Sequence, residues 1–305
     1  SLCTNACVLA GDVIHAAAGD YNEGAACHEP KSLFIRSRAI VKNGVTLVAD
    51  AGEGETFITG APAEGLPGGS IANGCGDTAI RCVTSYGGGI LRGFTLRDGY
   101  TCAVSGVNNN CLGGGYLGLT STARIEDCTI TNCYSHRSAL AHGGRYERCS
   151  LMGDTSAVGT GFDGNSTGMF GGFYNCRIIT SSNWAIMCPF VNCIMRNTSS
   201  NSTAGQYQIY ASSADLKRLT NCVFACSIRN TNTGTSADDY FPAISNNIVC
   251  TGFGGTTPSA ESKAWFKILT TAQIKEAYDY NHLSFKWTKS DLFCDAGVNV
   301  DSQMN

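Results

Sequence analysis

The chain has 305 residues, and its 21 Lys and Arg against 24 Asp and Glu give a net charge of -3. That balance leaves no overall electrostatic footprint for nucleic acid or for an anionic membrane, so binding of a polyanion would require a local patch. No apolar stretch reaches the roughly 20 residues that span a bilayer, which argues against membrane insertion. Abundant glycine (37 residues) and scarce proline (6 residues) favour many short strands joined by tight turns.

In chain order, the first expected element is an entry strand at residues 12–16, followed by a turn at residues 19–21. Residues 61–80 are rich in Gly and Pro and are expected to form a protruding loop. Further strands are expected at residues 45–48, 90–96 and 116–117. The first half of the chain is therefore predicted to consist of strands with Gly-rich turns.

A short phrase containing one cysteine recurs from the middle of the chain onward. Its copies are 126–130 (EDCTI), 147–151 (ERCSL), 174–178 (YNCRI), 191–195 (VNCIM) and 220–224 (TNCVF), with a degenerate copy at 246–249. The cysteines are 21, 27, 17 and 29 residues apart. Such unequal spacing favours a coiled β architecture, because insertions can be accommodated in its turns.

Within each copy, the cysteine and the residue two positions later are apolar, which is the alternation of a half-buried strand with the cysteine facing the core. Parallel stacking of such strands places equivalent residues about 4.8 Å apart, so each position becomes a column. The column before the cysteine comprises Asp127, Arg148, Asn175, Asn192 and Asn221. Its last three members predict an asparagine ladder.

The spacing of the apolar residues changes after Gly255. Trp265, Ile268 and Leu269 are followed by Ile274 at helical spacing. We therefore expect a parallel β-helix over residues 1–255 and a short, helical capping segment over 256–305 that packs on it and covers the open strand edges.

Seventeen cysteines are heavy usage, and none forms a zinc-binding block. Stacked cysteines of the repeat point side by side, with a torsion unsuited to disulfide formation, so most are expected to be free buried thiols. Loop pairs such as Cys102 with Cys111, or Cys75 with Cys82, are better candidates for disulfides. Disulfides would favour an extracytoplasmic setting.

Three stretches resemble bacterial surface and secreted proteins with right-handed parallel β-helix, pectate-lyase-like repeats. They are the opening phrase at 11–21 (GDVIHAAAGDY), the repeated N-C-x-I rungs, and the closing phrase at 294–299 (CDAGVN). Together they bracket nearly the whole chain. The resemblance implies an all-β right-handed solenoid and an extracellular or cell-surface location, but the fold hosts both enzymes and adhesins, so it leaves the chemistry open.

For an enzyme, the resemblance implies a polysaccharide lyase or a glycoside hydrolase. The best constellation comes from the column positions, which place Glu126 and Glu147 on neighbouring rungs about 5 Å apart, a separation that suits a retaining glycosidase or a cation site. Asp127 could join them as a calcium ligand; no other cofactor is expected. Arg145, Arg148, His136 and His142 complete this candidate catalytic set.

Two alternatives weigh against this site. Glu126 with Arg148, and Glu147 with Arg145, can be ordinary surface ion pairs worth under about 1 kcal/mol. His136 and His142 can be turn residues that bond to the backbone. We therefore expect a non-catalytic, adhesin-like or structural module that contacts polysaccharide or cell-surface glycan, with the polysaccharide-degrading enzyme as the alternative. A third hypothesis makes the chain one segment of a larger surface protein or assembly.

Overall fold

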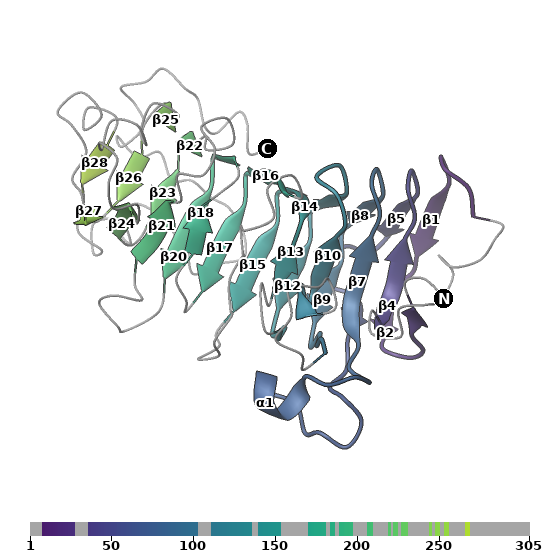
Figure 1. Ribbon diagram of the computed structural model, residues 1–305. Helices are drawn as coiled ribbons and strands as arrows, with labels where there is room; N and C mark the ends of the chain where they lie inside the picture. Colours follow the sequence, from purple (N-terminus) through teal and green to yellow (C-terminus); the bar gives the residue numbers. More distant parts are fainter. Residues whose placement is uncertain are drawn as a thin grey trace. The chain divides into compact units, whose positions relative to one another are not determined.

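The structure is a computed structural model in which two compact units are distinguished, unit 1 (Ser1–Gly172) and unit 2 (Phe173–Asn305). Each unit is described by itself (Figure 1). The residues described are 8–27, 36–102, 111–135, 140–153, 170–180, 184–186, 189–197, 206–209, 219–220, 222–224, 227–230, 244–245, 248–250, 253–255 and 266–268.

Unit 1 contains three sheets, called A, B and C. In spatial order, sheet A consists of β1 (Val13–Ala16), β5 (Thr46–Ala49), β8 (Ile90–Arg92), β11 (Arg124–Glu126) and β14 (Gly144–Glu147). Sheet B consists of β2 (Gly19–Tyr21), β6 (Thr56–Thr59), β9 (Thr95–Arg97), β12 (Thr129–Thr131) and β15 (Ser150–Gly153). Sheet C consists of β3 (Ala26–Cys27), β4 (Arg36–Val41), β7 (Arg81–Ser85), β10 (Tyr116–Gly118) and β13 (Ala141–His142).

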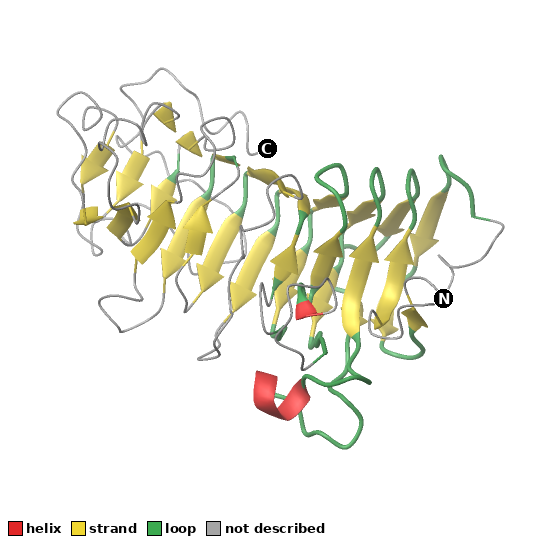
Figure 2. Ribbon diagram, viewed as in Figure 1, coloured by secondary structure: helices red, strands yellow, loops and turns green. Residues whose placement is uncertain are grey.

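The chain visits these sheets in a fixed order. From β4 to β15 it passes through C, A and B four times in succession, and the neighbouring strands of each sheet are parallel. An exception is β3, which pairs antiparallel with β4. Parallel strands stacked in this way are consistent with a parallel β-helix, and the expected all-β class is confirmed (Figure 2).

Apolar columns explain why the strands stack in this register. In sheet A, Leu47, Leu91 and Ile125 are aligned on consecutive strands and are at most 6% exposed. Sheet B has an equivalent buried column. Its members are Ile58, Leu96, Ile130 and Leu151. Since a shift of one residue would turn each of these side chains outward, burial fixes the register.

The column that precedes the cysteines adopts a left-handed backbone. Asp127, Arg148, Asn175 and Asn192 have φ values of 52, 53, 54 and 53°. Asp and Asn tolerate this region better than most residues because their short side chains bond locally. In unit 2, Nδ2 of Asn192 donates to Oδ1 of Asn175 at 3.1 Å, which confirms the asparagine ladder for these two residues. Asn221 lies outside the described residues.

The cysteines whose side chains the structure describes are buried free thiols. They include Cys128, Cys149, Cys176, Cys193 and Cys222 of the repeat, as expected. The expected disulfides are wrong, since Cys75, Cys82, Cys102 and Cys111 are also free. Two of these four, Cys102 and Cys111, instead belong to an apolar cluster with Leu112 and Leu117, where a thiol packs as a small hydrophobic group.

The expected loop at residues 61–80 is an excursion between β6 and β7 that carries the short helix α1 (Ile71–Gly74). Ser70 caps this helix by accepting a hydrogen bond from the Asn73 amide at 3.1 Å. Tyr100 ties the excursion to unit 1, because its ring packs with Ala63 and Cys75 and its hydroxyl accepts from the Gly69 amide at 2.8 Å. Figure 1 shows α1 projecting from the strands.

Unit 2 repeats the three-strand pattern. One set is β16 (Phe170–Tyr174, which begins in unit 1), β19 (Phe190–Val191), β22 (Leu219–Thr220) and β25 (Ile244–Ser245). A second set is β17 (Arg177–Thr180), β20 (Ile194–Asn197), β23 (Val223–Phe224), β26 (Ile248–Cys250) and β28 (Phe266–Ile268). The third set is β18 (Trp184–Ile186), β21 (Gln206–Ile209), β24 (Ser227–Asn230) and β27 (Phe253–Gly255).

The capping segment needs one correction. Within residues 256–305 the described part is Phe266–Ile268, which forms strand β28 in parallel register with β26 instead of the expected helix. Backbone pairing with Ile248–Cys250 outweighs the helical spacing of the apolar residues here. The domain boundary at residue 255 stays a prediction. No helix in the described part of the chain has the length and apolar character needed to cross a membrane.

Candidate functional site

The outer face of sheet A carries the charged residues that the repeat predicts. Glu126 on β11 is aligned with Glu147 on β14, so the two glutamates do lie on adjacent strands. Arg124 and Arg145 are aligned two residues earlier and share that face, since alternate side chains of a strand point the same way. The structure adds Arg92 on β8, which is aligned with Glu126 on the other side.

Glu126 is held among three arginines. Its Oε2 accepts hydrogen bonds from Nε and Nη2 of Arg92 at 3.0 and 2.7 Å. Its Oε1 lies 2.9 Å from Nη2 of Arg124. The two atoms form an ion pair, but their geometry does not make a hydrogen bond. Nη2 of Arg148 lies 3.8 Å from Oε2. The Glu126 side chain is only 4% exposed, so its charge is neutralised by arginines more than by water.

Glu147 has a similar environment. Its Oε1 accepts from Nε of Arg145 at 2.7 Å and from Nη2 of Arg124 at 3.0 Å. Nη1 of Arg148 lies 3.7 Å from Oε2. The side chain of Glu147 is 14% exposed. The pairs Glu126 with Arg148 and Glu147 with Arg145, anticipated as ordinary ion pairs, are both present in the structure.

The residues that follow the two glutamates, Asp127 and Arg148, form a further ion pair. Arg148 donates from Nε and Nη2 to the two carboxylate oxygens of Asp127 at 2.6 and 2.8 Å. This two-pronged hydrogen bond, together with the charges of Asp127 and the two glutamates, raises the pKa of Arg148 above its usual range. Arg148 is therefore a permanent cation.

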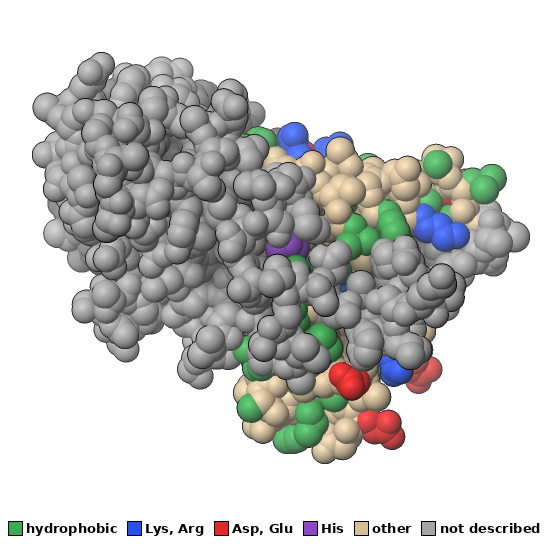
Figure 3. Space-filling model, viewed as in Figure 1, with side chains coloured by type: hydrophobic (Ala, Val, Ile, Leu, Met, Phe, Trp, Pro, Cys, Tyr) green, Lys and Arg blue, Asp and Glu red, His purple; other side chains and the backbone are tan. Residues whose placement is uncertain are grey.

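We call Arg92, Arg124, Arg145 and Arg148 the arginine cluster. Against Glu126, Asp127 and Glu147 these four arginines leave a formal charge of +1. Their side chains are 40 to 45% exposed, whereas the two glutamates are largely covered. The exposed side chains of this site are therefore the four arginines and Asp127, which is 43% exposed. On the face shown in Figure 3, the described Lys, Arg, Asp and Glu side chains are few.

This geometry suits anion recognition better than acid–base catalysis. The carboxylates of both glutamates are already engaged by arginine side chains. A nucleophile must reach its substrate, and Glu126 is almost fully covered. Exposed guanidinium groups, in contrast, match the planar oxygen pairs of carboxylates and sulfates.

His142 does not join the glutamates on this face. His142 is 1% exposed and lies on β13 of sheet C, not on sheet A. His136 lies outside the described residues. For calcium, no group of three or more His, Cys, Asp or Glu side chains within the described ranges is arranged to hold a metal ion. Glu126, Glu147 and Asp127 instead have arginines as their partners.

One carboxyl near this site was not anticipated. Glu53, in the loop between β5 and β6, accepts a hydrogen bond from Oγ1 of Thr129 at 2.7 Å, while its backbone carbonyl accepts from Oγ1 of Thr95 at 2.6 Å. Burial raises the pKa of Glu53, and the charge of Asp127 raises it further against the opposing effect of the Thr129 hydrogen bond. Glu53 is therefore a half-buried acid placed against the turn that carries Asp127.

Fold and site together define an all-β protein of stacked parallel strands with an arginine-rich outer face. Comparison with known proteins adds no family to this description. No protein-family model matches the chain, and neither a curated protein nor a solved structure matches it significantly.

Proposed function

We propose that this chain is a right-handed parallel β-helix of the secreted or cell-surface type, and that it acts as a non-catalytic module that contacts a glycan through the arginine cluster. The observation that carries this proposal is the difference in exposure: four arginine side chains are 40 to 45% exposed, while the side chain of Glu126 among them is 4% exposed. A chain with a net charge of -3 thus has the local cationic patch that a polyanion requires.

The spacing of the patch fits a chain-like ligand. Arg124 and Arg145 are aligned on neighbouring strands, about 4.8 Å apart, and Arg92 lies one strand before Arg124. Repeating carboxylate or sulfate groups along an acidic polysaccharide could contact successive strands. The extracellular location rests on the resemblance of the opening, repeated and closing phrases, because the described cysteines provide no disulfide to support it.

The test is binding of the purified protein to polygalacturonate and chondroitin sulfate, with dextran as a neutral control. We expect binding to the two acidic polymers that weakens as salt is added, and none to dextran at this site. Release of unsaturated products or of reducing ends, measured in the same samples, would instead support the lyase or hydrolase alternative.

Variants at Arg148 separate charge from fold. Arg148→Asn removes the cation and suits the left-handed backbone, whereas Arg148→Lys keeps the charge. We expect Arg148→Asn to weaken binding about two- to fivefold, the range for one exposed ion pair, and Arg148→Lys to weaken it less. Equal affinity of both variants and the parent would remove Arg148 from the contact surface.

A further inference from the structure

A cavity whose lining includes no member of the arginine cluster lies at the end of unit 1 formed by β1 and β2. Its volume is about 430 Å³, within the range of about 300 to 1,000 Å³ that small-molecule sites occupy. Strands β1 and β2 are the first members of sheets A and B. Among the described residues, core-facing side chains therefore border this cavity instead of a further strand.

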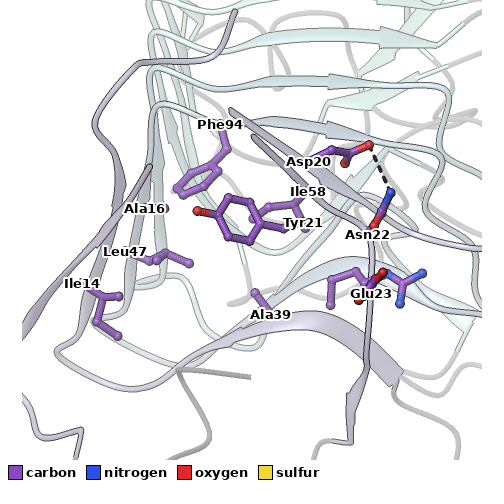
Figure 4. Close-up of a pocket in the computed structure, with 11 residues that line it drawn as sticks. Ile14, Ala16, Asp20, Tyr21, Asn22, Glu23, Ala39, Leu47, Ile58 and Phe94 are labelled. Atoms are coloured by element: carbon purple, nitrogen blue, oxygen red, sulfur yellow. Dashed lines mark hydrogen bonds between the residues drawn. The ribbon is translucent and has the colours of Figure 1, made fainter. Parts of the chain in front are cut away.

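The wall of this cavity is apolar. Ile14, Leu47, Ile58 and Phe94 line it from four strands or turns. Tyr21 also lines it and is 40% exposed, and its hydroxyl donates to the carbonyl of Ala17 at 3.0 Å, which fixes the ring. Figure 4 places the Tyr21 ring between apolar side chains on one side and polar ones on the other.

The rim is polar, with both donors and acceptors. Arg38 donates from Nε to the carbonyl of Thr59 at 2.7 Å and from Nη1 to the carbonyl of Gly24, so its guanidinium is held in place. Asp20 accepts from Oγ1 of Thr59 at 2.6 Å and from Nη2 of Arg97 at 3.0 Å.

Two further polar groups complete the rim, Asn22 and Glu23. Nδ2 of Asn22 lies 3.5 Å from a carboxylate oxygen of Asp20, as the dashed line in Figure 4 shows. Burial lowers the pKa of Arg38, while the charges of Asp20 and Glu23 favour its protonated form. Arg38 therefore stays a cation with two carboxylates near it.

We propose that this cavity binds a neutral sugar unit at the end of a glycan. Hydroxyl groups both donate and accept, which matches the carboxylate, amide and guanidinium groups of the rim. The CH face of a sugar ring matches Tyr21 and the apolar wall. Arg38 and Arg97, which pairs with Asp20, balance the charges of Asp20 and Glu23, so the rim favours a neutral sugar, in contrast to the arginine cluster with its formal charge of +1. This inference rests on the proposed glycan-binding function but concerns a separate site.

The probes are methyl galactoside, methyl glucoside and methyl rhamnoside, with methyl galacturonide as the acidic match of the first. Saturation-transfer NMR and titration would measure binding to the full chain. We expect saturable binding of at least one neutral glycoside with a Kd of ~1 mM. Methyl galacturonide should bind at least about fivefold more weakly than methyl galactoside.

Two variants test the residues. Tyr21→Ala removes the ring and should weaken neutral glycoside binding about two- to tenfold, whereas Tyr21→Phe keeps the ring and most of the affinity. Glu23→Gln removes one negative charge and should reduce the preference for galactoside over galacturonide. Leu66→Ala is the matched control, because Leu66 is 37% exposed but lies in the excursion and not among the residues that line the cavity.

The outcomes distinguish this site from the arginine cluster. If the folded parent binds none of the neutral glycosides but still binds polygalacturonate, the cavity proposal alone is overturned. Glycoside binding that survives Tyr21→Ala also overturns it, as would stronger binding of a cationic amine such as phenethylamine. Retained glycoside binding without polygalacturonate binding would reject the arginine cluster and leave the cavity as the glycan site.

Discussion

Arg92 and Glu126 are aligned on neighbouring strands, and Arg92 donates two hydrogen bonds to one carboxylate oxygen at 3.0 and 2.7 Å. The partners differ in exposure, at 45% for Arg92 and 4% for Glu126. Loss of the arginine would leave a covered carboxylate with fewer compensating donors, which costs more than the pair itself contributes. The Arg92–Glu126 pair therefore contributes to the stability of the fold as well as to the charge of the outer face of sheet A.

Arg92→Ala should therefore lower the free energy of unfolding by about 1.5 to 3 kcal/mol, the range for hydrogen bonds to charged groups. Glu126→Gln should also destabilise, and the double variant should cost less than the sum of the two, with a coupling of about 1 kcal/mol. Urea denaturation measures all three. Glu55→Gln, at an exposed position, should stay within about 0.5 kcal/mol of the parent. Additive effects of Arg92→Ala and Glu126→Gln would contradict the coupling.

The turn at Asp127 supplies a backbone test. Its φ of 52° is unfavourable for an alanine by about 1 to 2 kcal/mol, but not for glycine. Asp127→Ala and Asp127→Gly both lose the exposed ion pair with Arg148, so the difference between them isolates the backbone. We expect Asp127→Gly to be the more stable variant by about 1 kcal/mol in urea or thermal denaturation. Equal stability would mean that the turn relaxes.

The repeat in the sequence predicts one part of this site, the alignment of the two glutamates. Glu126 and Glu147 occupy the same place in two similar phrases, so their alignment could be predicted. Arg92 belongs to the same column but is harder to recognise, because Gly93 and Phe94 stand where Asp127 and Cys128 stand in the repeat. Glycine with a φ of 80° and phenylalanine fill the same turn and core positions without the cysteine that marks the later copies.

Two other features, the sheet to which His142 belongs and the contact of Glu53 with Thr129, cannot be predicted from neighbouring residues in the sequence. The position of His142 on the segment between the two rungs predicts that it lies near the glutamates. In the structure it belongs to the two-residue strand β13 of sheet C, and Gly143 and Gly144, both with positive φ, lead from it into β14 of sheet A. Glu53 reaches Thr129 across 76 residues of sequence. Only the stacking of the strands brings such residues together, and residue spacing does not reveal it.

Glu53 gives a pH dependence with a defined sign. Its pKa is raised in the folded protein, so folding favours the protonated acid. The contribution to stability is present below the unfolded pKa, near 4.5, and is lost as pH rises through the higher folded pKa. Glu53→Gln keeps an acceptor for Thr129 without the charge. We expect a higher Tm than the parent at pH 7 and little difference at pH 4, by differential scanning calorimetry. A constant Tm difference at both pH values would contradict this assignment.

The buried thiols give a final prediction on chemistry. Burial raises the pKa of Cys128 to about 12, and Cys149 is likewise 0% exposed. At pH 8 only about one Cys128 side chain in ten thousand would be the reactive thiolate. Iodoacetamide should therefore leave both residues unlabelled in the native protein and label them in urea, as read by peptide mass spectrometry. Glu55→Cys supplies an exposed thiol in the same chain as a positive control. Labelling of native Cys128 at the rate of the Glu55→Cys thiol would mean that the core opens around the repeat, and would contradict the packing that holds Glu126 and Glu147 in register.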